Sequence, residues 1–206
     1  YWRDHISMNM VLADRKYVQI ISSRACPYHC AYCHNMFGKK LRQRSPENVL
    51  EEIGILHRRH GVREFHFVDD AFNIDRDRMR RLLNLIIQTG LPIHIAFPNG
   101  LRADRLERDD LDLMRRAGVY MVTFAVESAS ARIQEIIHKN LNLARVTESI
   151  RHANRIGLIT KGFFMLGFPY ETAAEIRQTI KFALDSDFDL VSFFKVIPFY
   201  RSLSSG

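Results

Sequence analysis

The feature that most constrains the fold of this chain is a regular alternation of short apolar runs with longer stretches of helical periodicity. The apolar runs, which read as strands, lie at 17–22, 65–68, 93–97, 120–126, 160–166 and 190–197. The helical stretches lie at 45–61, 75–90, 106–117, 131–138 and 143–156, and a last one begins at 171. No hairpin signal separates neighbouring strands, so the strands are expected to be parallel and joined by right-handed helical crossovers.

The ends of the helices carry their own signals. Ser45, followed by proline, and Asp75 are suited to cap helix N-termini, and Gly61 and Gly90 are suited to end the same two helices. The inward face of the last helix is expected to hold three apolar residues spaced four apart, Ile176, Ile180 and Leu184.

About six strand and helix units predict an α/β fold of the partial (β/α)6 TIM-like barrel type. A doubly wound open sheet is the structural alternative, because periodicity alone does not separate the two. No repeat, low-complexity tract or linker divides residues 1–206, so we expect one domain. The first residue is not Met and the chain ends in RSLSSG, so we expect this domain to be a fragment of a longer chain.

All three cysteines of the chain stand in one short stretch, RACPYHCAYCHN. An odd number of closely spaced thiols is poorly suited to disulfides, whereas Cys26, Cys30 and Cys33 on one loop can converge on a metal centre. Such a site lacks one ligand. A structural zinc site completed by His29 or His34 is the alternative, although structural zinc sites normally show paired ligand spacing.

Polar residues cluster where the predicted strands end. Asp69 and Asp70 follow one strand, Glu127 and Ser128 follow another, and Gly167 follows a third. In β/α barrels the carboxyl ends of the strands form the catalytic rim. Each residue taken alone also fits a structural role, as a helix cap or part of a turn. Their common position favours a functional site.

Charge and hydropathy narrow the class of protein. The formal net charge is +7 and the pI is about 9.5, but the arginines fall in helix-like stretches such as DRDRMRRLL and are explained as solvated helix faces. We therefore do not expect a nucleic-acid partner. No run is long and apolar enough for a membrane span, and clustered free thiols suit a reducing compartment, so we expect a cytoplasmic protein with no membrane partner.

The spacing CxxxCxxC, with Tyr32 before the last cysteine, resembles the signature of the radical S-adenosylmethionine (radical SAM) superfamily. Further segments resemble the core of the group that often carries a cobalamin-binding domain: RSPENVLEEI, FVDDAFN, NGLRAD, VESAS, HKNL, GFFMLGFPYET and the late Pro198. The resemblance covers nearly the whole chain.

The resemblance implies a cofactor set. In this superfamily three cysteines hold a 4Fe-4S cluster, and S-adenosylmethionine (SAM) chelates the fourth iron and is cleaved reductively to a 5'-deoxyadenosyl radical. It also implies an electron donor such as a flavodoxin or ferredoxin, and an unidentified small-molecule or peptide substrate. Cobalamin would be supplied by a domain outside this chain. The expected reaction is radical chemistry on that substrate, with cobalamin-linked methylation or rearrangement as examples.

Most of the implied SAM contacts fall on the rim. By resemblance, Tyr32 helps to seat the adenine. Asp69 and Asp70 stand where many members have a Gly-Gly-Glu run that contacts the methionyl amine, and the resemblance does not say which carboxylate takes that role. Glu127 and Ser128 resemble the polar pair that contacts the ribose or the amino-acid part of SAM.

Two further contacts are implied, and two positions depart from the family pattern. Lys139 matches a basic residue that neutralises the methionyl carboxylate, and Gly167 belongs to a segment that contacts adenine. In that segment Phe163 replaces the first glycine, and Glu171 lies one residue late. Ala25 replaces the glycine that commonly precedes the first cysteine.

Two alternatives stay open from the sequence. A methylthiotransferase-like modifier of tRNA or protein has a similar radical core and would carry a second set of cluster-binding cysteines upstream. A non-catalytic metal-binding module is the alternative from another class, and three rather than four cysteines together with a populated rim argue against it.

Overall fold

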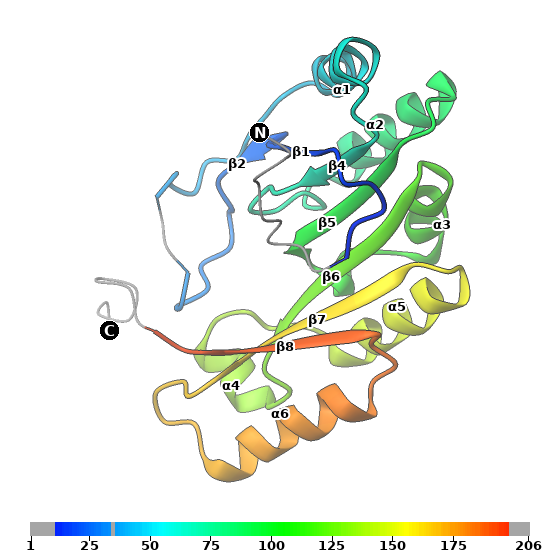
Figure 1. The fold of residues 1–206 in the computed structure, drawn as a ribbon. Helices are drawn as coiled ribbons and strands as arrows, with labels where there is room; N and C mark the ends of the chain where they lie inside the picture. The colour runs from blue at the N-terminus through cyan, green and yellow to red at the C-terminus, as the bar shows by residue number, and fades with distance from the viewer. Residues whose placement is uncertain (1–10, 34–35, 198–206) are drawn as a thin grey trace.

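The computed structural model describes residues 11–33 and 36–197 and shows one parallel sheet with helices packed along it (Figure 1). The sheet has six strands: β1 (Tyr17–Ile20), β4 (Glu64–Phe67), β5 (His94–Leu101), β6 (Val119–Glu127), β7 (Ile159–Leu166) and β8 (Leu190–Lys195). They lie in chain order, and every neighbouring pair is parallel. Within the described ranges β1 and β8 form the two edges, so the sheet is an open barrel. The doubly wound alternative is wrong, because it needs a reversal of strand order that this sheet lacks.

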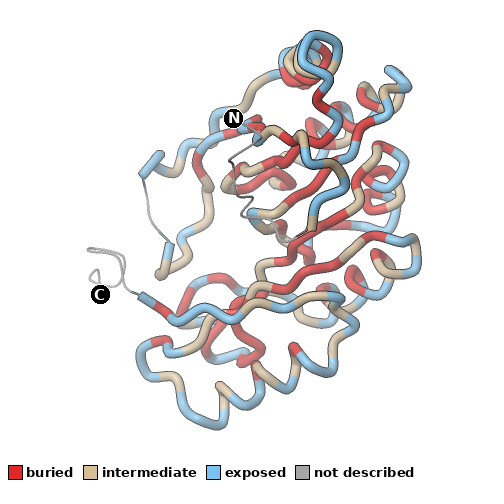
Figure 2. Tube along the Cα trace, viewed as in Figure 1, coloured by how far each residue is buried: buried red, intermediate tan, exposed pale blue. Residues whose placement is uncertain are grey.

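The helices connect successive strands and cover the outer face of the sheet (Figures 1 and 2). They are α1 (Pro46–His60), α2 (Arg76–Thr89), α3 (Arg108–Arg116), α4 (Ala131–Ile136), α5 (Leu143–Arg155) and α6 (Ala173–Asp185), with a 3-10 turn at Ala103–Arg105. Among these helices, none is long and apolar enough to cross a membrane.

The predicted helix ends are confirmed for α1 and α2. Ser45 and Asp75 accept a hydrogen bond from the backbone N–H three residues on, and Gly61 and Gly90 close the helices in the left-handed conformation, each with φ 62°. Both ends satisfy backbone groups that a helix leaves without an internal partner.

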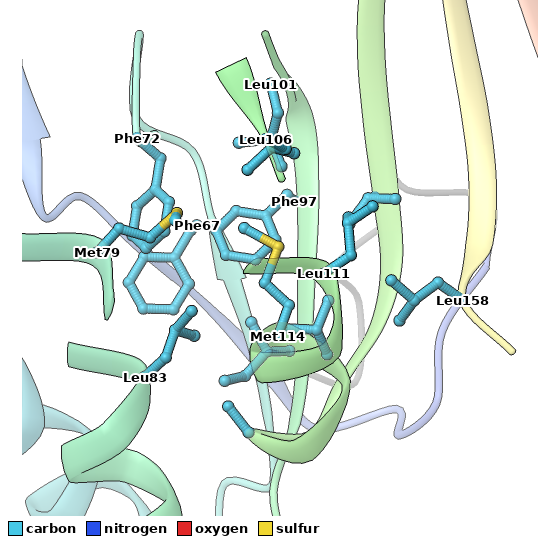
Figure 3. Packing of buried hydrophobic residues seen from close by; sticks show 14 of the residues in the cluster. Phe67, Phe72, Met79, Leu83, Phe97, Leu101, Leu106, Leu111, Met114 and Leu158 are labelled. Carbon is cyan, nitrogen blue, oxygen red and sulfur yellow. The ribbon is translucent and has the colours of Figure 1, made fainter. Parts of the chain in front are cut away.

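The main core lies between the sheet and the helices (Figure 3). Phe67 and Phe97 project from neighbouring strands with ring centroids 5.5 Å apart, and Phe72 packs on both. Met79 and Leu83 approach from α2 (Figure 3). Alternate strand residues therefore turn toward the helices, and the residues between them line the concave inner face of the open barrel.

Contacts across the inner face confirm this assignment. A Cβ placed on Gly100 would lie 3.1 Å from the Ala125 Cβ and 4.0 Å from the Phe163 ring. Phe163 in turn meets Phe194 of β8 edge-on, with centroids 5.2 Å apart. Gly100, Ala125, Phe163 and Phe194 thus share the inner face across four consecutive strands.

A short antiparallel pair outside the main sheet was not expected from the sequence. β2 (Ser23–Arg24) and β3 (Arg42–Gln43) form a two-stranded antiparallel pair. Each strand is only two residues long, which leaves no periodicity to detect. The pair closes the loop that carries the three cysteines and joins its two ends.

The predicted inner face of the last helix is partly wrong. Leu184 is 72% exposed, whereas Thr179 and Ala183 are the buried residues of α6. The helix also begins at Ala173 rather than at 171, because Thr172 caps it together with Glu175. Apolar spacing indicated the wrong edge of the buried face, because a threonine and an alanine occupy the buried positions.

Candidate cofactor site

The predicted rim residues largely converge on one pocket of about 160 Å³ at the carboxyl ends of the strands. Seven of its lining residues are predicted site residues: Cys26, Cys30, Cys33, Tyr32, Asp70, Glu127 and Lys139. They come from the cysteine loop, the β4–α2 loop, the end of β6 and the turn after α4. The pocket therefore brings together segments that are distant in sequence.

Two backbone N–H groups of the cysteine loop donate hydrogen bonds to the barrel. The Ala25 N–H donates to Asp70 Oδ2 at 3.1 Å, and the Ala31 N–H donates to the Ile137 carbonyl at 3.0 Å. Ala25 has φ 72°, a left-handed conformation that favours glycine. This backbone turn gives a physical reason for the glycine that the resembled family commonly has at this position.

The thiols differ in their electrostatics. A hydrogen bond from the Cys33 thiol lowers the pKa of Cys30 to about 6, and the positive charges of Lys139 and Arg102 act in the same direction. The pKa of Cys33 is correspondingly raised, and burial raises the pKa of Cys26. Cys30 is therefore a thiolate at neutral pH, the form in which cysteine binds metals.

The donor set fits an iron-sulfur cluster better than a single ion. In residues 11–33 and 36–197, no three His, Cys, Asp or Glu side chains are gathered closely enough to hold one metal ion. The three thiols nevertheless line the same pocket, with cationic Lys139 and Arg102 beside them. Thiolate donors spread around a space larger than one ion suit a cluster. His34 of the zinc alternative lies outside the described residues.

Glu127, Lys139 and Tyr32 form a hydrogen-bonded triad at the pocket wall. The Lys139 ammonium donates to Glu127 Oε1 at 2.9 Å and to the Tyr32 hydroxyl at 3.0 Å, and that hydroxyl donates to Glu127 Oε1 at 3.2 Å. Glu127 and Lys139 are each only 7% exposed. Burial and the Glu127 charge raise the pKa of Tyr32, so it stays protonated.

Glu127 is not a helix cap, because the N-cap of α4 is Ser130. The backbone at Glu127 is left-handed, with φ 68°. For a residue with a side chain this conformation is unfavourable, and such residues cluster at functional sites. The turn places the carboxylate at the pocket rather than along the strand.

The two adjacent aspartates have different positions. Asp69 is buried and its Oδ1 accepts hydrogen bonds from the Ser22 N–H, the Ser22 hydroxyl and the Ser23 hydroxyl at 2.5–3.1 Å. It holds the start of the cysteine loop and does not line the pocket. Asp70 does line it. Of the two carboxylates, Asp70 is therefore the one placed to meet a ligand.

Ser128 and Gly167 do not line this pocket. Ser128 is fully buried, lies 3.2 Å from the Thr179 hydroxyl and accepts a hydrogen bond from the Ser130 N–H. The Gly167 N–H donates to Glu171 Oε2 at 2.6 Å, which closes the loop after β7. The roles predicted for Ser128 and Gly167 in SAM binding stay predictions.

Two asparagines and an arginine are among the lining residues that the sequence analysis does not name as site residues. Asn73, Asn99 and Arg102 line the pocket. The Arg102 guanidinium lies 4.3 Å from the centre of the Tyr28 ring and pairs with Asp104 at 2.9 Å, and Asn73 Nδ2 donates to the Arg102 carbonyl. Their signal was present in the segments FVDDAFN and NGLRAD, which follow strands.

An open parallel β/α barrel whose rim carries a three-thiolate pocket defines a cofactor-binding enzyme domain. The model of the radical SAM superfamily matches residues 20–183. The chain belongs to the radical SAM superfamily and is a radical SAM enzyme domain.

Similar proteins include methyltransferases. The chain is 36% identical over 193 residues to cytidylyl-2-hydroxyethylphosphonate methyltransferase of Streptomyces wedmorensis, covering 89% of this chain and 36% of that protein. It is 35% identical over 182 residues to an uncharacterised methyltransferase of Pyrococcus horikoshii, covering 87% and 39%. This chain thus spans well under half the length of both relatives.

The fold is similar to that of TsrM from Kitasatospora setae, described as a radical S-adenosylmethionine methyltransferase with cobalamin and a [4Fe-4S] cluster bound. The TM-score is 0.79 at 19% identity, covering 86% of this chain and 34% of that one. At this identity the similarity shows the fold alone.

Proposed function

We propose that this chain is the catalytic core of a radical SAM enzyme, which holds a 4Fe-4S cluster through Cys26, Cys30 and Cys33 and binds SAM beside it. The observation that carries the proposal is the shared pocket. The three thiols line it together with polar side chains that suit the amine, the carboxylate and the ribose of SAM. When bound, the cluster supplies the electron that breaks a carbon-sulfur bond of SAM.

The residues around the thiols offset the negative charge of the thiolates and exclude water from them. Lys139 and Arg102 lie close enough to lower the pKa of Cys30, so they also offset the negative charge of bound thiolates. Tyr28, packed under the Arg102 guanidinium, and Tyr32 supply apolar surface around the loop. An active centre that generates radicals benefits from such exclusion of water and competing reactions.

Different polar residues suit different chemical groups of the SAM molecule. The Asp70 carboxylate suits the methionyl ammonium, and the Lys139 ammonium suits the methionyl carboxylate. Glu127 holds Lys139 in place in the free chain and can accept hydrogen bonds from the ribose hydroxyls. Phe168, whose ring meets the Tyr32 ring edge-on at 5.8 Å, extends the wall toward the proposed adenine site.

We propose methyl transfer as the reaction class of the parent enzyme, with cobalamin supplied by a part of it beyond this chain. The names of the two relatives and of TsrM support this branch. A flavodoxin or ferredoxin is the proposed electron donor. The substrate is unidentified, and the methylthiotransferase-like alternative differs in the group transferred.

Anaerobic reconstitution of the full chain with iron and sulfide tests the proposal. About four irons per chain are expected, with SAM binding that depends on them. Changing Cys30 to alanine should abolish stable cluster binding, because a three-thiolate site has no spare ligand. A stoichiometric zinc ion with no uptake of iron would overturn the proposal.

A further inference from the structure

Lys161, on the inner face of β7, is a buried cation with no oxygen partner among residues 11–33 and 36–197. Three cationic side chains in the described part of the chain are buried: Arg78, Lys139 and Lys161. Arg78 donates to two backbone carbonyls and Lys139 pairs with Glu127, whereas the contact found for Lys161 is with the Phe163 ring. Lys161 is only 8% exposed. A buried ammonium normally has a counter-charge, so its partner is expected to come from outside the described residues.

A second polar group beside it also lacks a partner. Thr123 on β6 is the strand neighbour of Lys161 in the register of the sheet. Its hydroxyl is fully buried and has no hydrogen-bond partner within the described residues. Buried hydroxyls are rarely left in this state. Two donors, one of them charged, therefore lie on neighbouring strands of the inner face.

Lys161 is linked through the Phe163 ring to residues that line the cofactor pocket. The Lys161 ammonium is 5.1 Å from the centre of the Phe163 ring. That ring contacts the position of Gly100, and Gly100 and Ala125 both line the pocket. The ammonium therefore reaches from the barrel interior to the floor of the site where radical chemistry is proposed.

The nearest interior carboxylates do not satisfy Lys161. Glu127 is engaged by Lys139 and Tyr32. Glu64, lower on the inner face, is engaged by His66 at 2.6 Å and by the Tyr120 hydroxyl at 2.7 Å. An anion that enters the barrel would meet an ammonium that no acid of the described residues pairs with.

From this arrangement we infer that Lys161 and Thr123 form the substrate subsite for an oxyanion, a phosphate, phosphonate or carboxylate group. The inference rests on the proposed function, because it makes the barrel interior the substrate chamber. An ammonium and a hydroxyl are complementary to such a group, and a charge-assisted hydrogen bond in a buried site is strong. The anion would hold the substrate with its remaining atoms directed up toward the SAM pocket.

The test uses inorganic phosphate and methylphosphonate, titrated calorimetrically into the reconstituted, SAM-loaded chain. Lys161→Met removes the charge and keeps the apolar stem, and Thr123→Val removes the hydroxyl at constant shape. Lys161→Met should weaken binding roughly tenfold or more, and Thr123→Val less. Lys181→Met is the matched control, because Lys181 is an exposed lysine on α6 paired with Asp185. Iron content and SAM affinity should be unchanged in all three variants.

Equal anion affinity in the wild type and Lys161→Met, or no measurable anion binding at all, would overturn the inference. A parallel loss of SAM affinity would also overturn it, since Lys161 would then serve the SAM carboxylate. The two proposals can fail separately. Absence of iron uptake on reconstitution contradicts the cluster. Absence of an effect of Lys161→Met on anion binding, which can also be titrated on the metal-free chain, contradicts the subsite. Should Lys161→Met fail to fold, Lys161→Gln gives the same comparison.

Discussion

At the scale of single residues, backbone strain marks the rim of this barrel. Ala25 and Glu127 both have left-handed φ angles, and both lie where a loop turns from a strand toward the pocket. Residues with side chains adopt this conformation only when their surroundings stabilise it. At Ala25 the hydrogen bond to Asp70 provides that stabilisation, and at Glu127 the ion pair with Lys139 does.

Ala25→Gly is expected to stabilise the chain slightly. Removing Cβ relieves a left-handed strain of about 1–2 kcal/mol, and the greater freedom of glycine in the unfolded state offsets about 0.5–1 kcal/mol of that gain. Urea denaturation should therefore show a free energy of unfolding higher by about 0.5 kcal/mol. Ala153→Gly, at a buried position in α5, is the control and should destabilise. Destabilisation by both variants would contradict the prediction.

Cys30 is expected to be the most reactive thiol of the metal-free, reduced chain at neutral pH. Its pKa is lowered to about 6, so above that pH it is mostly thiolate, while Cys26 and Cys33 stay protonated. Pulse alkylation with iodoacetamide and peptide mapping should modify Cys30 before Cys33, although Cys33 is the more exposed of the two.

Lys139→Met should shift the midpoint of Cys30 alkylation to higher pH, because the Lys139 charge helps to lower the pKa of Cys30. The control Lys181→Met should leave the midpoint in place. Preferential alkylation of Cys33 in the wild type would show that exposure, and not electrostatics, determines reactivity here.

At the scale of elements, the glycines in the turns between helices and strands differ in the atoms that an added Cβ would contact. Gly118 precedes β6 with φ 93°, and a Cβ there would lie 2.5 Å from the Ile93 carbonyl oxygen. Gly118→Ala combines backbone strain with a clash against backbone, so a loss of about 3 kcal/mol is expected in urea denaturation.

Gly90→Ala is the matched comparison for Gly118→Ala. Gly90 also has a left-handed φ, of 62°, but a Cβ there would meet nothing within 4 Å. Its alanine variant should lose only about 1 kcal/mol, the cost of the left-handed conformation. Similar losses at the two positions would show that the close approach to Ile93 is relieved at little cost.

The helices and strands also show how much of the fold the sequence predicts. All six strands of the main sheet and the helices between them follow from periodicity and capping residues, because burial of one face imposes the periodicity and the unpaired backbone groups at helix ends favour capping residues. The β2–β3 pair is too short to leave a pattern. The apolar spacing of α6 predicts Leu184 on the inner face, but Thr179 and Ala183 are the buried residues and Leu184 is exposed.

The sequence predicts which loops form the candidate site, but not which side chains of those loops line the pocket. Asp69 and Asp70 are adjacent in sequence, yet one is held by Ser22 and Ser23 and the other lines the pocket. That choice depends on the direction of the chain after β4, which no local pattern encodes. Arg102 was missed for the same reason, because its partner Tyr28 is distant in sequence.

At the scale of the whole molecule, the open sheet has two polar levels on its inner face. The upper level holds the thiols, Glu127 and Lys139 at the rim, and the lower level holds Glu64, His66 and Tyr120. Lys161 lies between them. The charged groups of each level have partners within that level. A substitution in one level can therefore serve as a control for a substitution in the other.

Glu127→Gln is expected to weaken SAM binding without loss of the cluster. Glutamine keeps an acceptor for Lys139 and Tyr32, so the pocket wall should persist, but it removes the negative charge from a nearly buried site. Loss of a charge-assisted hydrogen bond should lower SAM affinity roughly ten- to hundredfold. The thiolates lie on another loop, so the iron content should match that of the wild type.

Glu64→Gln is the matched control for Glu127→Gln, because Glu64 is also a buried carboxylate with two side-chain partners, at the opposite end of the strands. It should lower the melting temperature, since it weakens the bond to His66, and leave SAM affinity unchanged. Equilibrium dialysis with SAM, iron analysis and thermal melts on the two variants separate the roles. Unchanged SAM affinity in Glu127→Gln with intact iron would make Glu127 a structural partner of Lys139, and the charged contacts with SAM would then come from Asp70 and Lys139.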